Sequence, residues 1–251
     1  MTDTVRRVHR HGVIDSSSEA AFRSLESGEA RHGDVHVAAG QTAGRGRLGR
    51  TWESAASEGL YLSVLLLPPE PLTHPALLTV AAGLAVRDAA VDLGCSKVSL
   101  KWPNDVMVAG AKLAGILVES RGFDPTRPHY VVGIGVNVAQ RDFPAELKAE
   151  RAVTSLALLG LEASAEQVEE RVLHHLDARL AAARDRLPEL ETDYLEATGL
   201  RGASVRLRRG DEVGEGFLEG FSLREGLLLR RRDGWLAKFP VEHVTAVEPV
   251  S

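Results

Sequence analysis

Residues 97–120 read KVSLKWPNDVMVAGAKLAGILVES, and their pattern indicates the fold class. Strand-like runs follow one another here, separated by a turn at Pro103–Asp105 and a turn at Gly110. Strands joined by such short turns pair antiparallel, because a parallel pair needs a crossover of about a dozen residues or more. The stretch therefore predicts antiparallel pairing at this point of the chain.

Further strands are expected on both sides of this stretch, at residues 34–40, 60–67 and 129–138. A long, largely buried helix is expected before it, with Pro75 in the first turn and Gly94 at the end. Many strands around one long helix favour an α+β fold with a mixed, mostly antiparallel sheet over a doubly wound parallel sheet.

Two more helical segments and a small β-barrel complete the expected elements. Candidate caps at Asp15 to Ser18 precede helical spacing through Leu25, and a longer helical pattern spans residues 163–194 with an interruption at Pro188. After Gly199 the chain consists of short runs separated by glycine-containing turns, which is typical of a small β-barrel. A domain boundary is therefore predicted near residue 199.

Composition excludes several classes of protein. Of the 251 residues 44% are hydrophobic and 26% are charged, which is ordinary for a folded domain, and the net charge of −5 argues against a general nucleic-acid binder. The single cysteine, Cys95, cannot form an internal disulfide, and the nine histidines show no metal-ligand spacing. The apolar stretches are too short to span a membrane and the N-terminus lacks a signal-peptide core, so a cytoplasmic protein is expected.

The loop GRGRLGRTW at residues 44–52 carries the strongest sign of a binding site. Gly44, Gly46 and Gly49 match the spacing G-x-G-x-x-G, which alone is weak evidence for a dinucleotide site. That fingerprint needs a helix directly after the loop, whereas here the strand at residues 60–67 comes next. A phosphate-loop ATPase would need Gly-Lys-Ser or Gly-Lys-Thr, which the chain lacks.

The same loop carries Arg45, Arg47 and Arg50. Guanidinium groups present planar sets of donors that match phosphate and carboxylate oxygens. These closely spaced cations repel one another unless an anion lies between them. We therefore expect a loop that is mobile when empty and ordered by a bound phosphate or adenylate. For this segment alone, a solvated basic turn is the alternative.

The segment from KWPND to Lys112 places polar groups in apolar surroundings. Pro103 restricts Trp102 to extended geometry, and Asn104 and Asp105 follow at a strand start, where they can face a ligand or a metal. Lys112 has apolar neighbours on both sides. Such a lysine either extends its ammonium to solvent or places it on a reacting carboxylate and phosphate.

Four segments, GRGRLGRTW, KWPND, KLAGILVE and GIGVN, stand in an order and at separations that resemble the biotin protein ligase family. The four motifs fall within residues 12–140, and the rest of the chain resembles the family in its overall layout. The resemblance implies a catalytic domain of the biotin/lipoate ligase type over residues 1–198, related to class II aminoacyl-tRNA synthetases, and an SH3-like barrel over residues 199–251. Too few residues precede VIDSSS for the DNA-binding domain of some family members, so a monofunctional ligase without repressor function is expected.

The resemblance also implies roles for individual residues. Catalysis would rest on Lys112, Arg45 and Arg47. Biotin would be bound by Ser16, Ser17, Ser18, Gln41, Arg45, Gly46, Arg47, Lys112, Gly115, Gly133 and Gly135. ATP and the adenylate would be bound by Arg50, Trp52, Asn104 and Asn137, and Asp105 would help to hold magnesium. Ser18 departs from the family pattern, which has Asn at this position.

The chemistry that the resemblance implies has two steps. Biotin and ATP give biotinyl-5′-AMP, and biotin is then transferred to a lysine of a biotin carboxyl carrier domain of an acyl-CoA carboxylase. Pairing into a homodimer is possible within the family. Two alternatives stay open at this stage: a lipoate or octanoate ligase of a related fold, and a non-catalytic protein that binds biotin or an adenine nucleotide.

Overall fold

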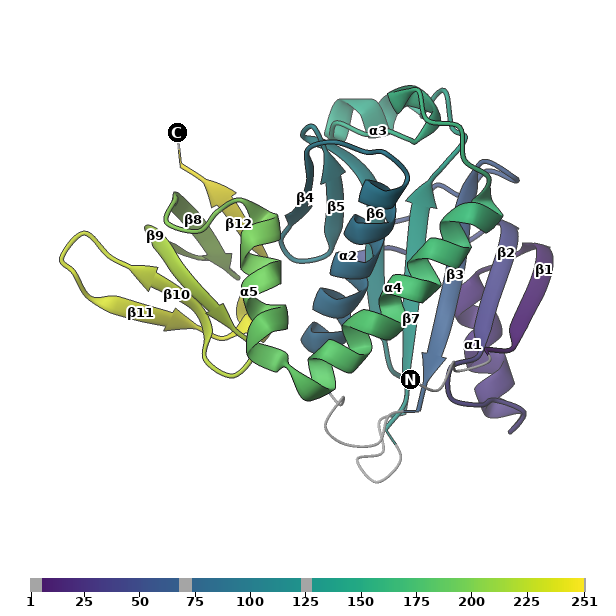
Figure 1. The fold of residues 1–251 in the computed structure, drawn as a ribbon, viewed down its shortest axis with the longest axis horizontal. Coiled ribbons are helices and arrows are strands. Elements are labelled where there is room, and N and C mark those ends of the chain that lie inside the picture. The colour runs from purple at the N-terminus through teal and green to yellow at the C-terminus, as the bar shows by residue number, and fades with distance from the viewer. Residues whose placement is uncertain (1–5, 68–73, 123–127, 251) are drawn as a thin grey trace.

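The computed structural model describes residues 6–67, 74–122 and 128–250. A seven-stranded sheet forms the larger part of the molecule, and a five-stranded sheet follows at the C-terminal end (Figure 1). The predicted α+β fold, with a mixed and mostly antiparallel sheet, is confirmed. The strands of the larger sheet, in spatial order, are β1 (Val8–Ile14), β2 (Val35–Gln41), β3 (Gly59–Leu66), β7 (Tyr130–Asn137), β6 (Ala111–Glu119), β5 (Asp105–Val108) and β4 (Val98–Lys101).

The antiparallel pairing predicted from residues 97–120 is present in β4, β5 and β6. Lys101 pairs with Asp105 across the first turn, and β5 joins β6 through Ala109 and Gly110. Both of these turn residues have positive φ, 49° and 85°, which is the geometry of a two-residue hairpin turn matched to the twist of a sheet. The KWPND and Lys112 segments are therefore neighbours at one end of the sheet.

Strand β1 is an element that the sequence did not reveal. It lies at the edge of the sheet and pairs parallel with β2, with Val8 opposite Val35. Helix α1 (Ser17–Glu26) forms the crossover between the two strands. The sequence VHRHGVI is rich in basic and imidazole side chains, which are uncommon in central strands but are tolerated at an edge.

The helices cover the two faces of the sheet unequally. Helix α2 (Pro75–Asp92) packs against α4 (Ala165–Asp185) on one face, and α1 lies on the other, as Figure 1 shows. The alternation along β3 separates these faces, because Val64 joins the large core and Leu65 joins a small cluster with Phe22 of α1. The long helical pattern is interrupted near Pro188, as expected: α4 ends at Asp185, and α5 (Leu187–Thr198) begins with Pro188 in its first turn. The short α3 (Ala145–Glu150) lies between β7 and α4.

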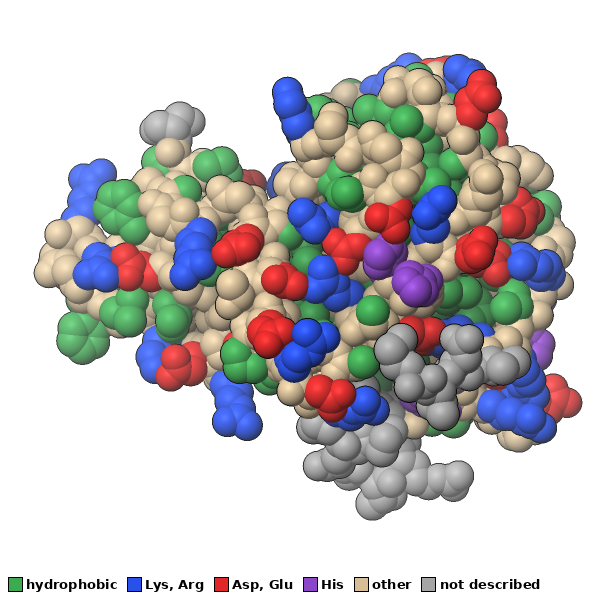
Figure 2. Space-filling view, in the orientation of Figure 1, with side chains coloured by type: hydrophobic (Ala, Val, Ile, Leu, Met, Phe, Trp, Pro, Cys, Tyr) green, Lys and Arg blue, Asp and Glu red, His purple; other side chains and the backbone are tan. Residues whose placement is uncertain are grey.

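The exposed side of α4 and α5 carries charges of both signs. Figure 2 shows basic and acidic side chains interspersed on this face. Arg179 of α4, for example, donates to Asp88 of α2 and to Asp193 of α5, with Nη1 at 2.5 Å from the latter carboxylate. Within the described part of the chain, no helix is long and apolar enough to cross a lipid bilayer.

The second sheet lies against the larger one through an aromatic contact. Its strands, in spatial order, are β11 (Leu236–Phe239), β10 (Gly226–Arg230), β9 (Glu212–Ser222), β8 (Ser204–Arg209) and β12 (Ala246–Pro249). Trp102 meets Tyr194 and Phe221 edge to face, at ring distances of 6.1 and 5.9 Å. The indole Nε1 donates to the carbonyl of Val244 at 2.9 Å. This contact brings residues just before β12 next to the KWPND turn.

Candidate active site

A cavity of about 330 Å³ lies on the face of the sheet that carries α1. The loop at residues 44–52 and the KWPND turn form its walls, strands β6 and β7 form its floor, and β12 with the residue before it lines one side. Of the predicted site residues, all but Asn137 line this cavity: Ser16, Ser17, Ser18, Gln41, Arg45, Gly46, Arg47, Arg50, Trp52, Asn104, Asp105, Lys112, Gly115, Gly133 and Gly135.

Glycines make the floor of the cavity from main chain. Gly115 and Gly135 are cross-strand partners in β6 and β7, and the ring of Trp52 rests directly on them. A Cβ atom would approach the indole to 2.9 Å at Gly115 and to 2.5 Å at Gly135, which is closer than real contacts allow. At Gly133 it would meet the Ser18 hydroxyl at 3.1 Å. A side chain at Gly115 or Gly135 would therefore force the indole to move, while at Gly133 the Ser18 hydroxyl would have to shift by a few tenths of an ångström.

One end of the cavity carries hydroxyl and amide groups. The Ser17 and Ser18 hydroxyls lie 2.9 and 3.0 Å from Ser63 Oγ, and Gln41 Oε1 accepts from the Ser17 amide at 2.9 Å. Ser16 is the N-cap of α1. Ser18 stands where the family pattern has Asn. It presents a hydroxyl to the cavity in place of a carboxamide. Ser63 was not identified from the sequence, because it stands as a lone serine inside an apolar strand.

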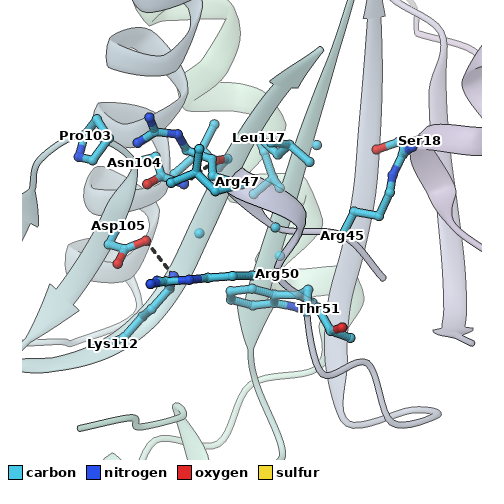
Figure 3. A pocket seen from close by; sticks show the side chains of 18 of the residues that line it. Ser18, Arg45, Arg47, Arg50, Thr51, Pro103, Asn104, Asp105, Lys112 and Leu117 are labelled. Atoms are coloured by element: carbon cyan, nitrogen blue, oxygen red, sulfur yellow. Dashed lines mark hydrogen bonds and ion pairs between the residues drawn. The ribbon is translucent and has the colours of Figure 1, made fainter. Parts of the chain in front are cut away.

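Lys112 projects into the cavity from β6 (Figure 3). Its side chain is 11% exposed, and its Nζ lies 2.5 Å from Asp105 Oδ1 and 5.2 Å from the centre of the Trp52 ring. Burial lowers the pKa of Lys112, and the Asp105 carboxylate acts in the opposite direction. The ammonium therefore does not extend to bulk solvent; it is held inside the cavity by a carboxylate and an aromatic face.

The arginines of the loop occupy different environments. Arg45 lies toward Ser18 and Arg47 toward Asn104 in Figure 3. Arg45 forms ion pairs with Glu19 and Glu119, so protein carboxylates rather than a bound anion neutralise it, which the spacing of the arginines did not predict. Burial lowers the pKa of Arg47, and no described residue forms an ion pair with it. Arg50 is exposed and approaches Glu150 only to 3.7 Å.

The two asparagines differ in position. Asn104 lines the cavity while its Nδ2 donates to the Ile116 carbonyl at 2.7 Å. Asn137 is buried, and its amide donates to the Thr154 carbonyl at 2.9 Å. It lines an adjacent cavity of about 590 Å³, which shares Lys112 and Trp52 with the first. Asn137 thus lies next to the cavity that the other predicted site residues line, and not in that cavity.

The electrostatic character of the main cavity is cationic. Six basic side chains line it, against the lining carboxylates of Asp105 and Glu248 and the adjoining carboxylates that pair with Arg45 and Arg151. Such an excess favours a polyanionic ligand, because guanidinium and ammonium groups pair with phosphate oxygens. The basic residues are Arg45, Arg47, Arg50, Lys101, Lys112 and Arg151.

Several lining residues were not assigned from the sequence. Lys101 begins the KWPND motif, and Arg151 follows α3. Thr245, Ala246 and Glu248 come from the second sheet, more than 100 residues beyond the other motifs. No local pattern marks these last three, because only the Trp102 contact brings them to the cavity.

A metal site built from protein alone is absent from the described residues, where no group of three or more His, Cys, Asp or Glu side chains could hold an ion. Asp105 supplies one carboxylate in the cavity, next to Lys112. That donor set fits magnesium that enters with a nucleotide, since Mg²⁺ commonly uses one or two carboxylates together with substrate phosphates and water.

Comparison with known proteins identifies the family of this chain. Residues 12–137, about half of the chain, match the model of the biotin/lipoate A/B protein ligase family. The chain belongs to this family. The family match contains the loop, the KWPND turn, Lys112 and all three glycines of the floor.

Individual relatives extend the similarity. The biotin--[acetyl-CoA-carboxylase] ligase of Mycobacterium tuberculosis is 39% identical over 186 residues, which cover 72% of this chain and 66% of that protein. The bifunctional ligase/repressor BirA of Bacillus subtilis is 38% identical over 140 residues, 55% of this chain and 43% of that relative, so the match spans less than half of its length. A biotin protein ligase from Aquifex aeolicus in complex with biotin and ATP has a TM-score of 0.81 and 29% identity, and the match covers 97% of this chain and 99% of that one.

Proposed function

We propose that this chain is a cytoplasmic, ATP-dependent biotin protein ligase, which forms biotinyl-5′-AMP and transfers biotin to a lysine of a biotin carboxyl carrier domain. The observation that carries the proposal is the position of the Lys112 ammonium. It lies in the same cavity as a polar end formed by Ser17, Ser18 and Gln41 and as further basic side chains. A small carboxylic acid bound at the polar end would meet a nucleotide phosphate at this ammonium. The complex of the Aquifex aeolicus ligase with biotin and ATP supports the same pair of substrates.

In the first step a carboxylate oxygen attacks the α-phosphorus of ATP, and pyrophosphate leaves. Both reactants are anionic, so the residues must reduce their repulsion and align them. Lys112 would contact the carboxylate and the α-phosphate. Arg47 would contact the phosphate side, because among the described residues it has no carboxylate partner of its own. Asp105 would hold magnesium, which spreads the phosphate charge when it is bound with ATP.

In the second step a neutral lysine amine attacks the acyl carbon, an amide forms, and AMP leaves. Neither step needs a covalent intermediate with the enzyme. The Trp52 ring covers Gly115 and Gly135, and the preceding residues of the same loop line the cavity. Both would keep water from the mixed anhydride until the amine arrives. The relative from Mycobacterium tuberculosis, by its name a ligase of acetyl-CoA carboxylase, supports a carrier domain as the acceptor.

A direct assay tests the proposal. The chain is incubated with ATP, magnesium, biotin and a biotin carboxyl carrier domain, and the intact mass of the carrier is measured. We expect the mass increase of one biotinyl group, together with release of pyrophosphate. An unchanged carrier mass with no pyrophosphate would refute ligase activity and would favour a protein that only binds biotin or a nucleotide.

The same assay distinguishes the other ligases of the family. Lipoate and octanoate replace biotin in parallel reactions, each with its own carrier domain. Pyrophosphate release with lipoate or octanoate but not with biotin would overturn the assignment of biotin. We favour biotin because the polar end of the cavity offers several hydroxyl and amide groups, including Ser17, Ser18 and Gln41. Such groups suit a polar ligand head better than an aliphatic chain.

A further inference from the structure

Glu248 is a carboxylate of the second sheet that lies on the wall of the cationic cavity. Ala246 and Glu248 lie on one face of β12 and line the cavity, while Val247 between them is buried in the core. The start of this segment is anchored to the KWPND turn, because the Trp102 indole donates to the Val244 carbonyl at 2.9 Å. The fold therefore directs Glu248 to the cavity from a part of the chain that contains none of the four motifs.

The Glu248 carboxylate is free to receive a positively charged group. Asp105, the other carboxylate that lines the cavity, is occupied by the Lys112 ammonium at 2.5 Å. Arg206 lies opposite Glu248 on β8, but its guanidinium pairs with Glu215 of β9 at 2.6 Å. In the part of the chain that the structure describes, no hydrogen bond or ion pair engages the Glu248 carboxylate. Its charge is therefore available to a ligand.

The negative charge of Glu248 discriminates among the reactants. A carboxylate repels phosphate oxygens, so a nucleotide can contact the uncharged Thr245 and Ala246 of the same wall but is not attracted by Glu248. A ribose hydroxyl or the adenine amine could donate to this carboxylate, but neither would neutralise it. The acceptor lysine is the reactant that carries a positive charge, and hydrogen bonds between ammonium and carboxylate groups are stronger than neutral ones.

The acceptor lysine meets a positively charged barrier. It arrives from solvent as an ammonium ion, because the ordinary pKa of lysine is about 10.4. Six basic side chains line the cavity that it has to enter. Glu248 is half-buried and Thr245 is exposed, so this part of the wall lies where the cavity meets solvent. A free carboxylate at this place offsets the repulsion that the lysine encounters first.

We propose that Glu248 binds the ammonium group of the acceptor lysine at this side of the cavity and takes the proton that the lysine loses before it attacks. The inference rests on the proposed function, because it assigns a residue to the second step. As the lysine advances, the charges of Lys112 and Arg47 favour the neutral amine. An N–H bond of the ammonium breaks and an O–H bond forms on Glu248, which gives a neutral amine and a carboxylic acid. The half-buried acid then returns the proton to solvent.

The two steps can be measured separately with one variant. The full chain is incubated with ATP, magnesium and biotin, and pyrophosphate release reports adenylate formation; a carrier domain is then added, and its mass increase reports transfer. We expect Glu248→Gln to form adenylate within about threefold of the wild-type rate and to transfer biotin about 10- to 100-fold more slowly, the usual range for loss of a hydrogen bond to a charged group. Glu248→Asp, which keeps the charge on a shorter side chain, should recover part of the transfer rate.

Glu212→Gln is the matched control, because Glu212 lies on the same sheet, outside the cavity, and pairs with Arg209. It should carry out both steps at wild-type rates. Equal transfer rates in Glu248→Gln and the wild type would overturn the proposal. An equal loss in both steps would also overturn it, because it would assign Glu248 to the nucleotide or to the fold. A wild type that makes no adenylate would refute the proposed function, and this inference with it.

A small uncharged nucleophile separates binding of the ammonium from damage to the adenylate site. Hydroxylamine is neutral at pH 7 and attacks acyl-adenylates without any carrier domain. We expect Glu248→Gln with bound adenylate to form the hydroxamate of biotin at the wild-type rate, because no ammonium has to be bound or deprotonated. A hydroxamate rate that falls in parallel with carrier transfer would contradict the role of Glu248 in lysine binding.

Discussion

Lys112 combines burial with a positive charge, and both properties matter for the proposed chemistry. The Asp105 carboxylate and the Trp52 ring hold its ammonium in the cavity, where water competes little for it. A charge in such a place needs no reorganisation when the phosphate arrives. A lysine that merely reached solvent, the alternative interpretation from sequence, would not be 11% exposed and paired with a carboxylate inside a cavity.

Replacement of Lys112 tests this role. We expect Lys112→Ala to slow pyrophosphate release about 100- to 1,000-fold, the usual cost of removing one charge-stabilising donor. The exposed Lys238→Ala in the second sheet is the control and should retain wild-type rates. Circular dichroism checks that both variants are folded. Near-normal pyrophosphate release by folded Lys112→Ala would show that this ammonium does not act on the reacting groups.

His36 should make the stability of the protein depend on pH. Its ring is buried between those of His9 and His11, with centroid distances of 4.7 and 5.4 Å. Burial and these two imidazoles lower the pKa of His36 to about 4, although Asp34 opposes the shift. The unfolded chain binds a proton near pH 6.5, whereas the folded chain does not. The free energy of unfolding is therefore complete above about pH 6.5 and falls as the pH drops from there toward 4.

Urea unfolding at pH 7 and pH 5 measures this effect. We expect the wild type to lose about 2 kcal/mol more than His36→Gln between these two pH values. His32→Gln, at an exposed position, should behave like the wild type. The same loss of unfolding free energy in His36→Gln and in the wild type would assign the pH dependence to other groups.

Among the elements, the pair of α2 and α4 covers most of one face of the sheet. Leu84 and Leu78 of α2 and Leu176 of α4 are fully buried in the main core. Helix α2 carries apolar residues on nearly all of its sides, whereas α4 has one apolar side and one charged, exposed side. Burial of a leucine side chain of this kind stabilises the fold by about 1.5–3 kcal/mol.

Truncation of one of these side chains tests the packing. We expect Leu176→Ala to lower the free energy of unfolding by about 2–5 kcal/mol, since the removed methyl groups leave a cavity between packed elements. Val91→Ala, at a position of α2 that is 45% exposed, should change it by less than about 0.5 kcal/mol. Urea unfolding gives both values. Similar losses from the two variants would indicate that the core around α4 can rearrange.

Whether an element can be predicted from the sequence depends on whether local patterns or long-range contacts specify it. The strands from β2 to β7 and helices α1, α2 and α4 were predicted, because apolar spacing and turn residues specify them locally. Strand β1 was missed because its pairing with β2 depends on α1 as a crossover, and its own residues are polar. The ion pairs of Arg45 with Glu19 and Glu119 were missed as well, since these two carboxylates are 100 residues apart in the sequence. Contacts of that kind arise only when the sheet assembles.

At the scale of the whole molecule, the second sheet takes part in the site. The Trp102 indole and the Phe221 ring hold it against the KWPND turn, and Thr245, Ala246 and Glu248 thereby reach the cavity. The polar end lies instead on α1, with Ser17 and Ser18, and on β3 of the larger sheet, with Ser63. Loosening the second sheet should therefore affect the two substrates unequally.

Phe221→Ala tests this asymmetry. We expect a loss of about 3–5 kcal/mol in unfolding free energy from the truncated core aromatic. We also expect a severalfold increase of the KM for ATP, with little change of the KM for biotin. Phe217→Ala, on the same strand but 46% exposed, is the control and should alter neither KM. An equal increase of both KM values in Phe221→Ala would show that the second sheet does not act on one substrate more than on the other.

The glycine floor has a consequence for how this chain tolerates mutation. Gly115, Gly133 and Gly135 are only half-buried, and exposure of that degree usually predicts that many amino acids are accepted. At Gly115 and Gly135 the accepted set should shrink to glycine, because a methyl group there would lie 2.9 or 2.5 Å from the Trp52 ring. In a saturation library selected for activity, these two codons should therefore be as invariant as those of catalytic residues, although glycine has no side chain to do chemistry. Intolerance at such positions would trace the seat of the Trp52 ring rather than the location of the reaction.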